Sequence, residues 1–192
     1  KVVDLAFPLR GAHTVSILTD RDPDALLVLR HSTAHVMAEA IQRIWPQALL
    51  AYGPALDTGF YYDISLDAPI SSNDFARIEK EMDKIVQENR PFTRYDLDPT
   101  EGMKRLEREG NKYKVDNAQR AVAGGAKSLS WYVTGKMDQN WEDLCMGPHV
   151  PSTGRPSAVS MLFTSTSTSS PGFTVISPFS VNSAGFTIPS DL

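Results

Sequence analysis

The chain has 192 residues, of which 41% are hydrophobic and 22% are charged, as in an ordinary soluble globular protein with a sizeable core. With 19 basic and 23 acidic residues the formal net charge is −4, which excludes a general nucleic-acid coat but not a local basic patch. No apolar run approaches the length of a membrane span. The single cysteine, Cys145, excludes an internal disulfide bond and fits a reducing compartment, so we expect a cytoplasmic protein.

The first 21 residues carry two short strand patterns, Val2–Phe7 and His13–Leu18, on either side of a turn at Gly11. About twenty residues cannot form a hydrophobic core by themselves. We therefore interpret residues 1–21 as the edge or the remnant of a neighbouring domain.

The next stretch predicts the longest helix of the chain. Asp22 is a favourable N-cap, Pro23 suits the first helical position, and Pro46 cannot continue the helix. Residues that are apolar except for Thr33 recur at steps of three and four along one face, namely Leu26, Leu29, Thr33, Met37, Ala40 and Ile44. His31 and His35 project together from the opposite side, which is small and nearly uncharged. This second side predicts another packed layer or a functional site.

Shorter elements follow and are bounded mostly by Gly, Pro, Ser and Asn. The predicted strands cover residues 48–52, 60–64, 92–95 and 129–134, and the predicted helices cover residues 73–90 and 99–109. Together these elements predict an α+β fold, in which an antiparallel sheet packs against the long central helix and further helices.

The composition changes after Arg155. Between residues 157 and 192 there is one charged residue, Asp191, and 15 of the 36 residues are Ser or Thr. Such a segment has little to drive a unique core. We expect residues 157–192 to form an atypical tail that does not continue the preceding domain, through an altered reading frame in the source gene or through disorder.

A second pair of reactive side chains lies far from the histidine helix. Cys145 and His149 have the same spacing as His31 and His35, and together the four are a plausible tetrahedral ligand set for zinc. The same four residues could instead form a polar site that positions a water molecule without metal. In a third interpretation the histidines and the buried thiol have no functional role. Asp143 is a candidate to hold the second nitrogen of one of the histidines.

At this point a family resemblance becomes specific. The motifs are His31-Ser32-Thr33-Ala34-His35, Gly59-Phe60-Tyr61-Tyr62-Asp63, Tyr113-Lys114 and Asp143-Leu144-Cys145-Met146-Gly147-Pro148-His149-Val150-Pro151. They occur in the order found in the threonyl-tRNA synthetases, and they resemble the editing domain that those enzymes share in outline with alanyl-tRNA synthetase. The resemblance implies an editing domain over residues 22–156, preceded in residues 1–21 by the end of a ubiquitin-like TGS domain.

The resemblance implies hydrolysis of seryl-tRNA wrongly made on threonine tRNA. The residues at the family's catalytic positions are His31, His35, Lys114, Cys145 and His149, and those at substrate-binding positions are Tyr62 and Asp143. Zinc would be held by His31, His35, Cys145 and His149. Serine and threonine differ by one methyl group, which binding alone separates by only about 1–3 kcal/mol, so a second, smaller site supplies the remaining discrimination.

The chain also departs from the family pattern. Met146 stands where the family usually has arginine, and the Ser/Thr-rich tail replaces the family's continuing sequence. We find no class II synthetase motifs, so we expect no ATP site in this chain and expect the ligase core of the same enzyme as a partner, together with tRNA. Two alternatives remain open, a non-catalytic RNA-binding or ribosome-associated relative and a module whose zinc is purely structural. A non-catalytic relative would be expected to lose the site residues, which are all present.

Overall fold

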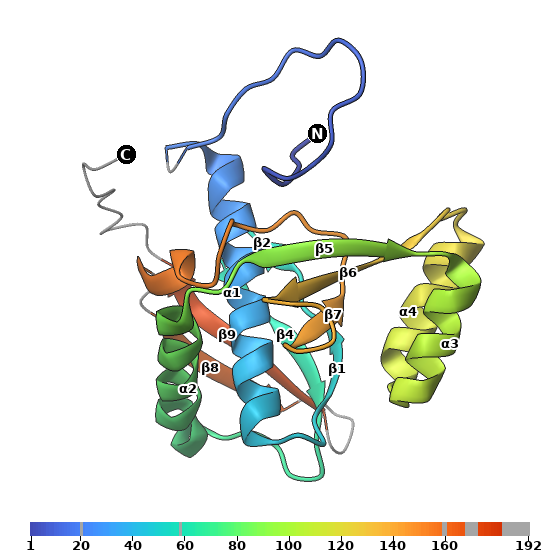
Figure 1. Cartoon of the computed structure of the whole chain (residues 1–192). Coiled ribbons are helices and arrows are strands. Elements are labelled where there is room, and N and C mark those ends of the chain that lie inside the picture. Colours follow the sequence, from blue (N-terminus) through green and yellow to red (C-terminus); the bar gives the residue numbers. More distant parts are fainter. Residues whose placement is uncertain (20, 58, 159–160, 168–172, 182–192) are drawn as a thin grey trace.

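The computed structural model of the chain describes residues 1–19, 21–57, 59–158, 161–167 and 173–181 (Figure 1). The helices are α1 (Pro23–Ile44), α2 (Phe75–Glu88), α3 (Pro99–Glu109) and α4 (Lys112–Ala123), with short 3-10 turns η1 (Ser72–Asp74) and η2 (Arg155–Ala158). The strands are β1 (Leu49–Tyr52), β2 (Ala55–Leu56), β3 (Gly59–Phe60), β4 (Tyr62–Ser65), β5 (Phe92–Leu97), β6 (Leu129–Thr134), β7 (Glu142–Leu144), β8 (Met161–Ser167) and β9 (Phe173–Val181). They form three antiparallel sheets with the strand orders β1-β4-β9-β8, β2-β3 and β5-β6-β7.

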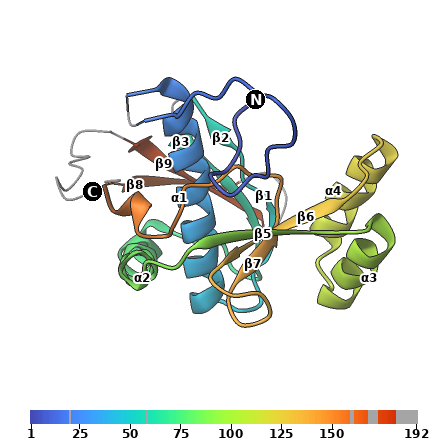
Figure 2. The same cartoon turned by 45° about the horizontal axis from the view of Figure 1, so that its top comes forward.

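Helix α1 runs through the middle of the molecule (Figures 1 and 2). Every residue from Ser32 to Ile41 is buried, so this part of the helix is surrounded on all sides. A helix in that position needs small or apolar side chains all round, and alanines at positions 34, 38 and 40 meet that need. The histidine side of the helix is therefore covered by a second packed layer.

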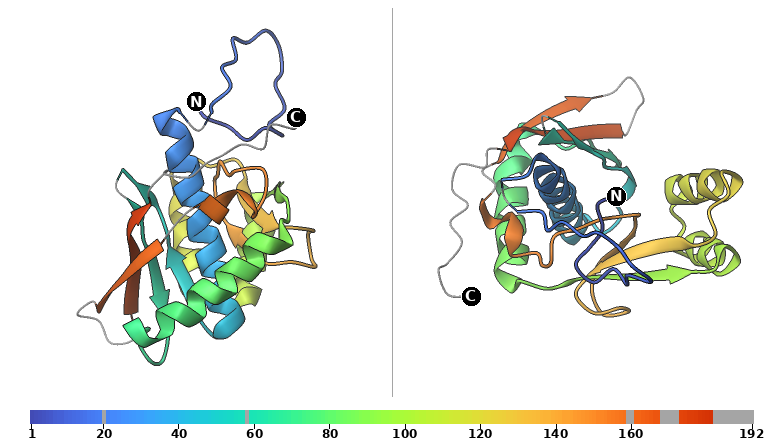
Figure 3. Two further views of the ribbon diagram at one scale, coloured as in Figure 1. Left: turned by 90° about the vertical axis from the view of Figure 1, so that its left-hand side faces the viewer. Right: turned by 90° about the horizontal axis from the view of Figure 1, so that it is seen from above.

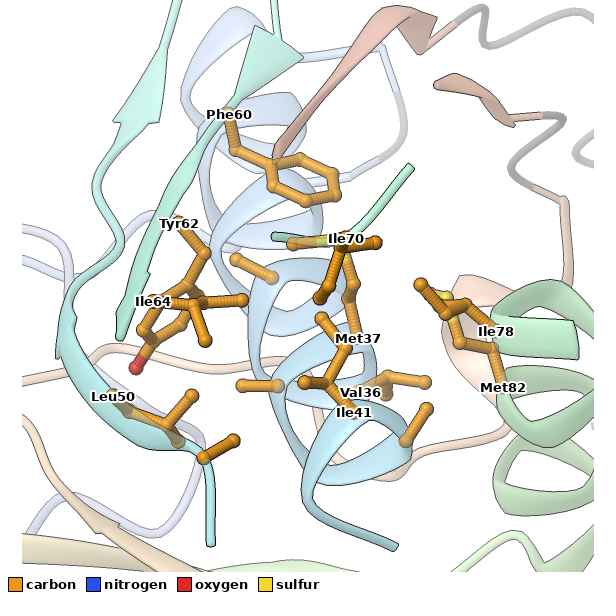
Figure 4. Close-up of a cluster of buried hydrophobic side chains, with 14 of the residues drawn as sticks. Val36, Met37, Ile41, Leu50, Phe60, Tyr62, Ile64, Ile70, Ile78 and Met82 are labelled. Carbon is orange, nitrogen blue, oxygen red and sulfur yellow. The ribbon is translucent and has the colours of Figure 1, made fainter. Parts of the chain in front are cut away.

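The main hydrophobic core lies on the other side of α1, between the four-stranded sheet and α2 (Figure 4). Its members come from α1, from strands β1, β3 and β4, and from α2; they include Met37, Ile41, Leu50, Phe60, Tyr62, Ile64, Ile78 and Met82. Full burial of one such side chain contributes about 1.5–3 kcal/mol to the free energy of folding. This cluster fixes α1 against the sheet and leaves its histidine side facing the second sheet.

A buried carboxylate connects α1 to that second sheet. Glu39 is 1% exposed and accepts hydrogen bonds from Arg90 Nη2 at 2.6 Å and from the Thr134 hydroxyl at 2.6 Å. Arg43 approaches the same carboxylate at 2.8 Å. Because a buried charge is tolerated only when it is paired, these contacts hold the middle of α1 close to the end of β6.

Strands β5 and β6 form a ribbon that carries the helix pair α3 and α4 at its far end (Figures 1 and 3). The ribbon is paired from Phe92 opposite Thr134 to Leu97 opposite Leu129. A smaller hydrophobic cluster fixes the helix pair on the ribbon, with Leu106, Ala118, Leu129 and Trp131 as its buried members. This arrangement brings the inner side of α4 next to β1.

The predicted fold class is confirmed, since helices and antiparallel sheets pack around one long central helix. The predicted strand 60–64 is interrupted at Tyr61, so it becomes β3 and β4 in different sheets. Helix α4 and strand β7 were not predicted. No described helix is long and apolar enough to span a membrane.

The prediction of two strands within residues 1–21 is wrong. The described part of this segment contains no strand and is mostly exposed. A strand pattern needs a neighbouring strand for its backbone hydrogen bonds, and among the described residues none pairs with it. The segment is instead fixed at Asp4, which contacts Tyr132 and His149.

The structure departs in part from the expectation that the Ser/Thr-rich tail, residues 157–192, does not continue the preceding domain. Strand β9 pairs with β4, from Tyr62 opposite Ile176 to Ser65 opposite Phe173, and β8 pairs with β9. The tail has one charged residue, Asp191, but is rich in Thr, Val, Ile and Phe, which have high strand propensity, and this propensity accounts for the two strands. Residues 159–160, 168–172 and 182–192 of the tail lie outside the described part of the chain.

Candidate functional site

Two segments far apart in sequence meet at the histidine side of α1. His31 and His35 are one helical turn apart on α1, and the segment that follows β7 brings Cys145 and His149 against them. One possible ligand atom of each of the four residues lies within 4.8 Å of those of the others. The structure thus joins the two pairs that the sequence analysis singled out.

Hydrogen bonds fix the orientation of His31. Its Nδ1 lies 3.2 Å from the Pro148 carbonyl oxygen, and its Nε2 lies 3.3 Å from Cys145 Sγ. A carbonyl oxygen can only accept, so Nδ1 carries the proton and the lone pair of Nε2 faces the thiol. The Gly147 amide also donates to Cys145 Sγ, at 3.2 Å. Gly147 has a φ of 68°, and a β-carbon at this position would overlap the Tyr132 hydroxyl, so a side chain here has neither the conformation nor the space.

The donor set fits a zinc ion. Tetrahedral zinc holds a histidine nitrogen at about 2.0–2.1 Å and a cysteine sulfur at about 2.3 Å, which places the two ligand atoms about 3.5 Å apart. Cys145 Sγ lies 3.3 Å from His31 Nε2 and 3.5 Å from His149 Nε2. The buried Nδ1 of His35 has no hydrogen-bond partner among the described residues. This group of lone pairs could hold a metal.

Burial keeps the site uncharged in the absence of a cation. Burial lowers the pKa of His31. Burial also places the pKa values of His35 and His149 well below the usual value, and for these two residues nearby imidazoles add to the effect. It also raises the pKa of the Cys145 thiol to about 12. Three neutral imidazoles and a protonated thiol are therefore expected at neutral pH, and zinc binding would release the thiol proton.

An ion pair adjoins the cluster. Lys114 on α4 contacts Asp143 on β7 at 2.7 Å, and the Tyr62 hydroxyl donates to the same carboxylate at 2.7 Å. Both charged side chains are almost fully buried, and both charges act on the pKa of His31. Two asparagines dock α4 in this position, because the side-chain amides of Asn111 and Asn117 donate to carbonyl oxygens of β1 at 2.8 Å.

The structure corrects one role and adds further residues. The expectation that Asp143 holds a histidine nitrogen is wrong, since its carboxylate is engaged by Lys114 and Tyr62, whereas the Pro148 carbonyl oxygen holds His31. The sequence analysis missed four side chains that contact His149 or the segment around it, which are Asp4, Ser32, Phe92 and Tyr132. Of these four, only Ser32 could have been identified from the sequence, because it lies within the motif that contains His31 and His35. Met146 is 84% exposed and contributes nothing to the core.

The chain was compared with known proteins. No family model matches it. It is 40% identical over 166 residues to the threonine–tRNA ligase of Desulforamulus reducens, an alignment that covers 84% of this chain and 25% of that protein. It is 38% identical over 160 residues to the threonine–tRNA ligase of Anaeromyxobacter dehalogenans, an alignment that covers 83% of this chain and 24% of that protein. It is 40% identical over 152 residues to the threonine–tRNA ligase of Hyphomonas neptunium, which covers 79% of this chain and 22% of that protein.

The chain is a homologue of the threonine–tRNA ligases. This finding confirms the resemblance to threonyl-tRNA synthetases, which is the other name of these enzymes. The chain spans about a quarter of the length of these relatives.

The cluster of His31, His35, Cys145 and His149 is expected to bind zinc. The purified chain, loaded with zinc and freed of excess metal, is expected to retain about one equivalent by elemental analysis, and Cys145→Ser is expected to retain almost none because a thiolate ligand is lost. The exposed His13 offers a control, since His13→Ala removes a histidine outside the cluster. Stoichiometric zinc that survives replacement of both His31 and His35 would place the metal elsewhere.

Proposed function

We propose that residues 22–156 form the editing domain of a threonine–tRNA ligase and hydrolyse the ester bond of seryl-tRNA wrongly made on threonine tRNA. The observation that carries this proposal is the convergence of three imidazoles and one thiol beside a buried Lys114–Asp143 pair, in a chain homologous to threonine–tRNA ligases. The substrate would be the aminoacylated 3′ end of the tRNA. The ligase core of the same enzyme would make the product that this domain corrects.

The residue types suit ester hydrolysis. Water attacks the carbonyl carbon of the ester, the bond to the ribose oxygen breaks, and that oxygen takes up a proton, which releases serine and free tRNA. In the site without metal the half-buried His31 is neutral, because burial lowers its pKa, and its Nε2 can accept the proton of the attacking water. Zinc held by the His31, His35, Cys145 and His149 cluster would take up that lone pair of His31 and would supply Lewis acidity in place of the base.

Charged and polar neighbours have separate roles in the proposal. Lys114 places a positive charge near the developing oxyanion, where a preorganised charge has its largest effect. Tyr62 and Asp143 would contact the seryl group or the terminal adenosine. The Asp143 carboxylate already pairs with Lys114, so the lysine is oriented before substrate arrives.

The experiment is a deacylation assay with two substrates. The chain is expected to hydrolyse seryl-tRNA for threonine and to spare threonyl-tRNA, since a site shaped around serine excludes the additional methyl group. His35→Ala is expected to lower the rate by about 10²–10³-fold through loss of the water or its proton path. Lys80→Ala, on the exposed side of α2, is the control and should have no effect.

Equal hydrolysis of both esters would contradict the proposal. Tight tRNA binding without hydrolysis would favour a non-catalytic RNA-binding relative. Bound zinc without hydrolysis or tRNA binding would favour a structural metal module.

A further inference from the structure

Ser32 makes three polar contacts from a fully buried position on α1. Its hydroxyl oxygen lies 2.8 Å from the Val28 carbonyl oxygen, 3.0 Å from the Val150 amide nitrogen and 3.1 Å from His149 Nδ1. One contact is within α1, and the other two reach the segment that carries Cys145 and His149. Ser32 therefore joins both halves of the site through one oxygen atom.

The number of protons available determines which atom donates and which accepts in each of these three contacts. A hydroxyl has one proton to donate and two lone pairs to accept with. The Val28 carbonyl oxygen can only accept, and as the shortest of the three contacts it takes the hydroxyl proton. The Val150 amide can only donate. The remaining lone pair of Ser32 then accepts from His149, which requires the proton of His149 to be on Nδ1.

The tautomer has a consequence for the site. With its proton on Nδ1, His149 directs the lone pair of Nε2 at Cys145 Sγ, 3.5 Å away. His31 also directs its Nε2 lone pair at this sulfur, with its Nδ1 held by the Pro148 carbonyl oxygen. Two imidazole lone pairs thus face one sulfur, which has a single proton to offer when it is a thiol.

We propose that Ser32 is the positioning residue that holds His149 in the Nδ1–H tautomer and aims its Nε2 at the centre of the site. The Val150 contact adds a second function, because it fixes the segment after Cys145 against α1. The assignment of the tautomer stands on the contacts alone. Its effect on turnover rests on the proposed function.

The neighbouring residue provides a matched control. Thr33 is also fully buried, and its hydroxyl donates to the Leu29 carbonyl oxygen at 2.8 Å, the same bond one position along the helix. Among the contacts of the described residues its hydroxyl reaches no histidine. Ser32→Ala and Thr33→Val therefore each delete one buried hydroxyl from the same turn of α1, and only the first touches His149.

The decisive measurement is nitrogen NMR of the metal-free chain with 15N-labelled histidine, in which correlations to the ring protons show which nitrogen is protonated. We expect His149 to carry its proton on Nδ1 in the unaltered chain and in Thr33→Val, and to become a mixture of tautomers in Ser32→Ala. A His149 protonated on Nε2 in the unaltered chain would overturn the proposal without any variant. An unchanged tautomer in a folded Ser32→Ala would overturn it as well.

The second measurement is deacylation of seryl-tRNA. Ser32→Ala is expected to lower kcat by about 10–100-fold with little change in KM, as for residues that orient a catalytic ligand, whereas Thr33→Val stays close to the unaltered chain. Equal losses in both variants would show a merely structural hydroxyl and overturn the positioning role. An unaltered chain without activity would refute the proposed function, and the NMR result would still decide the tautomer.

Discussion

Replacing Lys114 by alanine is expected to lower the free energy of unfolding by about 3–5 kcal/mol, the usual cost of removing one partner from a buried ion pair. The Lys114 and Asp143 side chains are 8% and 7% exposed, so water cannot replace the lost ammonium group. The remaining hydrogen bond from Tyr62 to Asp143 offsets only part of the loss. Urea unfolding followed by circular dichroism measures the change.

A double variant separates charge from packing. Lys114→Met with Asp143→Asn removes both charges and keeps an acceptor for the Tyr62 hydroxyl, so it should recover most of the stability that Lys114→Ala loses. Lys80→Ala removes an exposed lysine and should leave the free energy of unfolding within about 0.5 kcal/mol. A fully stable Lys114→Ala would show that the pair is not buried in solution.

This stability loss also bears on the assay of activity. A deacylation rate for Lys114→Ala reflects the oxyanion role only under conditions where the variant is folded. The double variant tests the Lys114–Asp143 pair as a unit, because it lacks both charges but is expected to stay folded. It should still lose about 10²–10³-fold in rate if Lys114 stabilises the oxyanion.

Acidification is expected to destabilise the metal-free chain below about pH 6.5. Burial places the pKa values of His35 and His149 well below the usual value, so the folded chain keeps both neutral where the unfolded chain binds a proton on each. The unfolded state then binds more protons, and the free energy of unfolding falls as the pH falls. The slope should approach about 2.7 kcal/mol per pH unit for the two groups below about pH 5.5.

Urea unfolding in the presence of a chelator, at about pH 7.5, 6.5 and 5.5, measures this slope. His35→Gln is expected to reduce the slope by about half, to about 1.4 kcal/mol per pH unit. His13→Gln changes an exposed histidine and should leave the slope unchanged. A free energy of unfolding that is constant across the whole range would mean that the two imidazoles are not buried in solution.

Local sequence signals predicted those elements whose boundaries are set within a few residues. Asp98 and Gly110 mark the two ends of α3 and are its N-cap and C-cap in the structure. Pro46 was predicted to end the long helix, and α1 ends two residues earlier, at Ile44. The same kinds of signal were present for α4, with Asn111 as the N-cap and Gly124 as the C-cap, and were overlooked because its mixed charged face obscures the apolar pattern.

Spacing also predicted each half of the candidate site. One helical turn separates His31 from His35, so their common side of α1 follows from helix geometry alone. The family motifs then implied that Cys145 and His149 complete the group. The structure brings the two pairs together, while the roles of the individual residues in catalysis stay predictions.

The sequence by itself determined the α+β class, the long buried helix and the reactive side chains, because periodicity and capping act over a few residues. Only the tertiary structure decided their partners. Lys114 and Asp143 are 29 positions apart, and Ser32 and His149 are 117 apart, so no local pattern could pair them. The tertiary structure also determined that residues 1–19 form no strand, because a strand exists only where another strand satisfies its backbone hydrogen bonds.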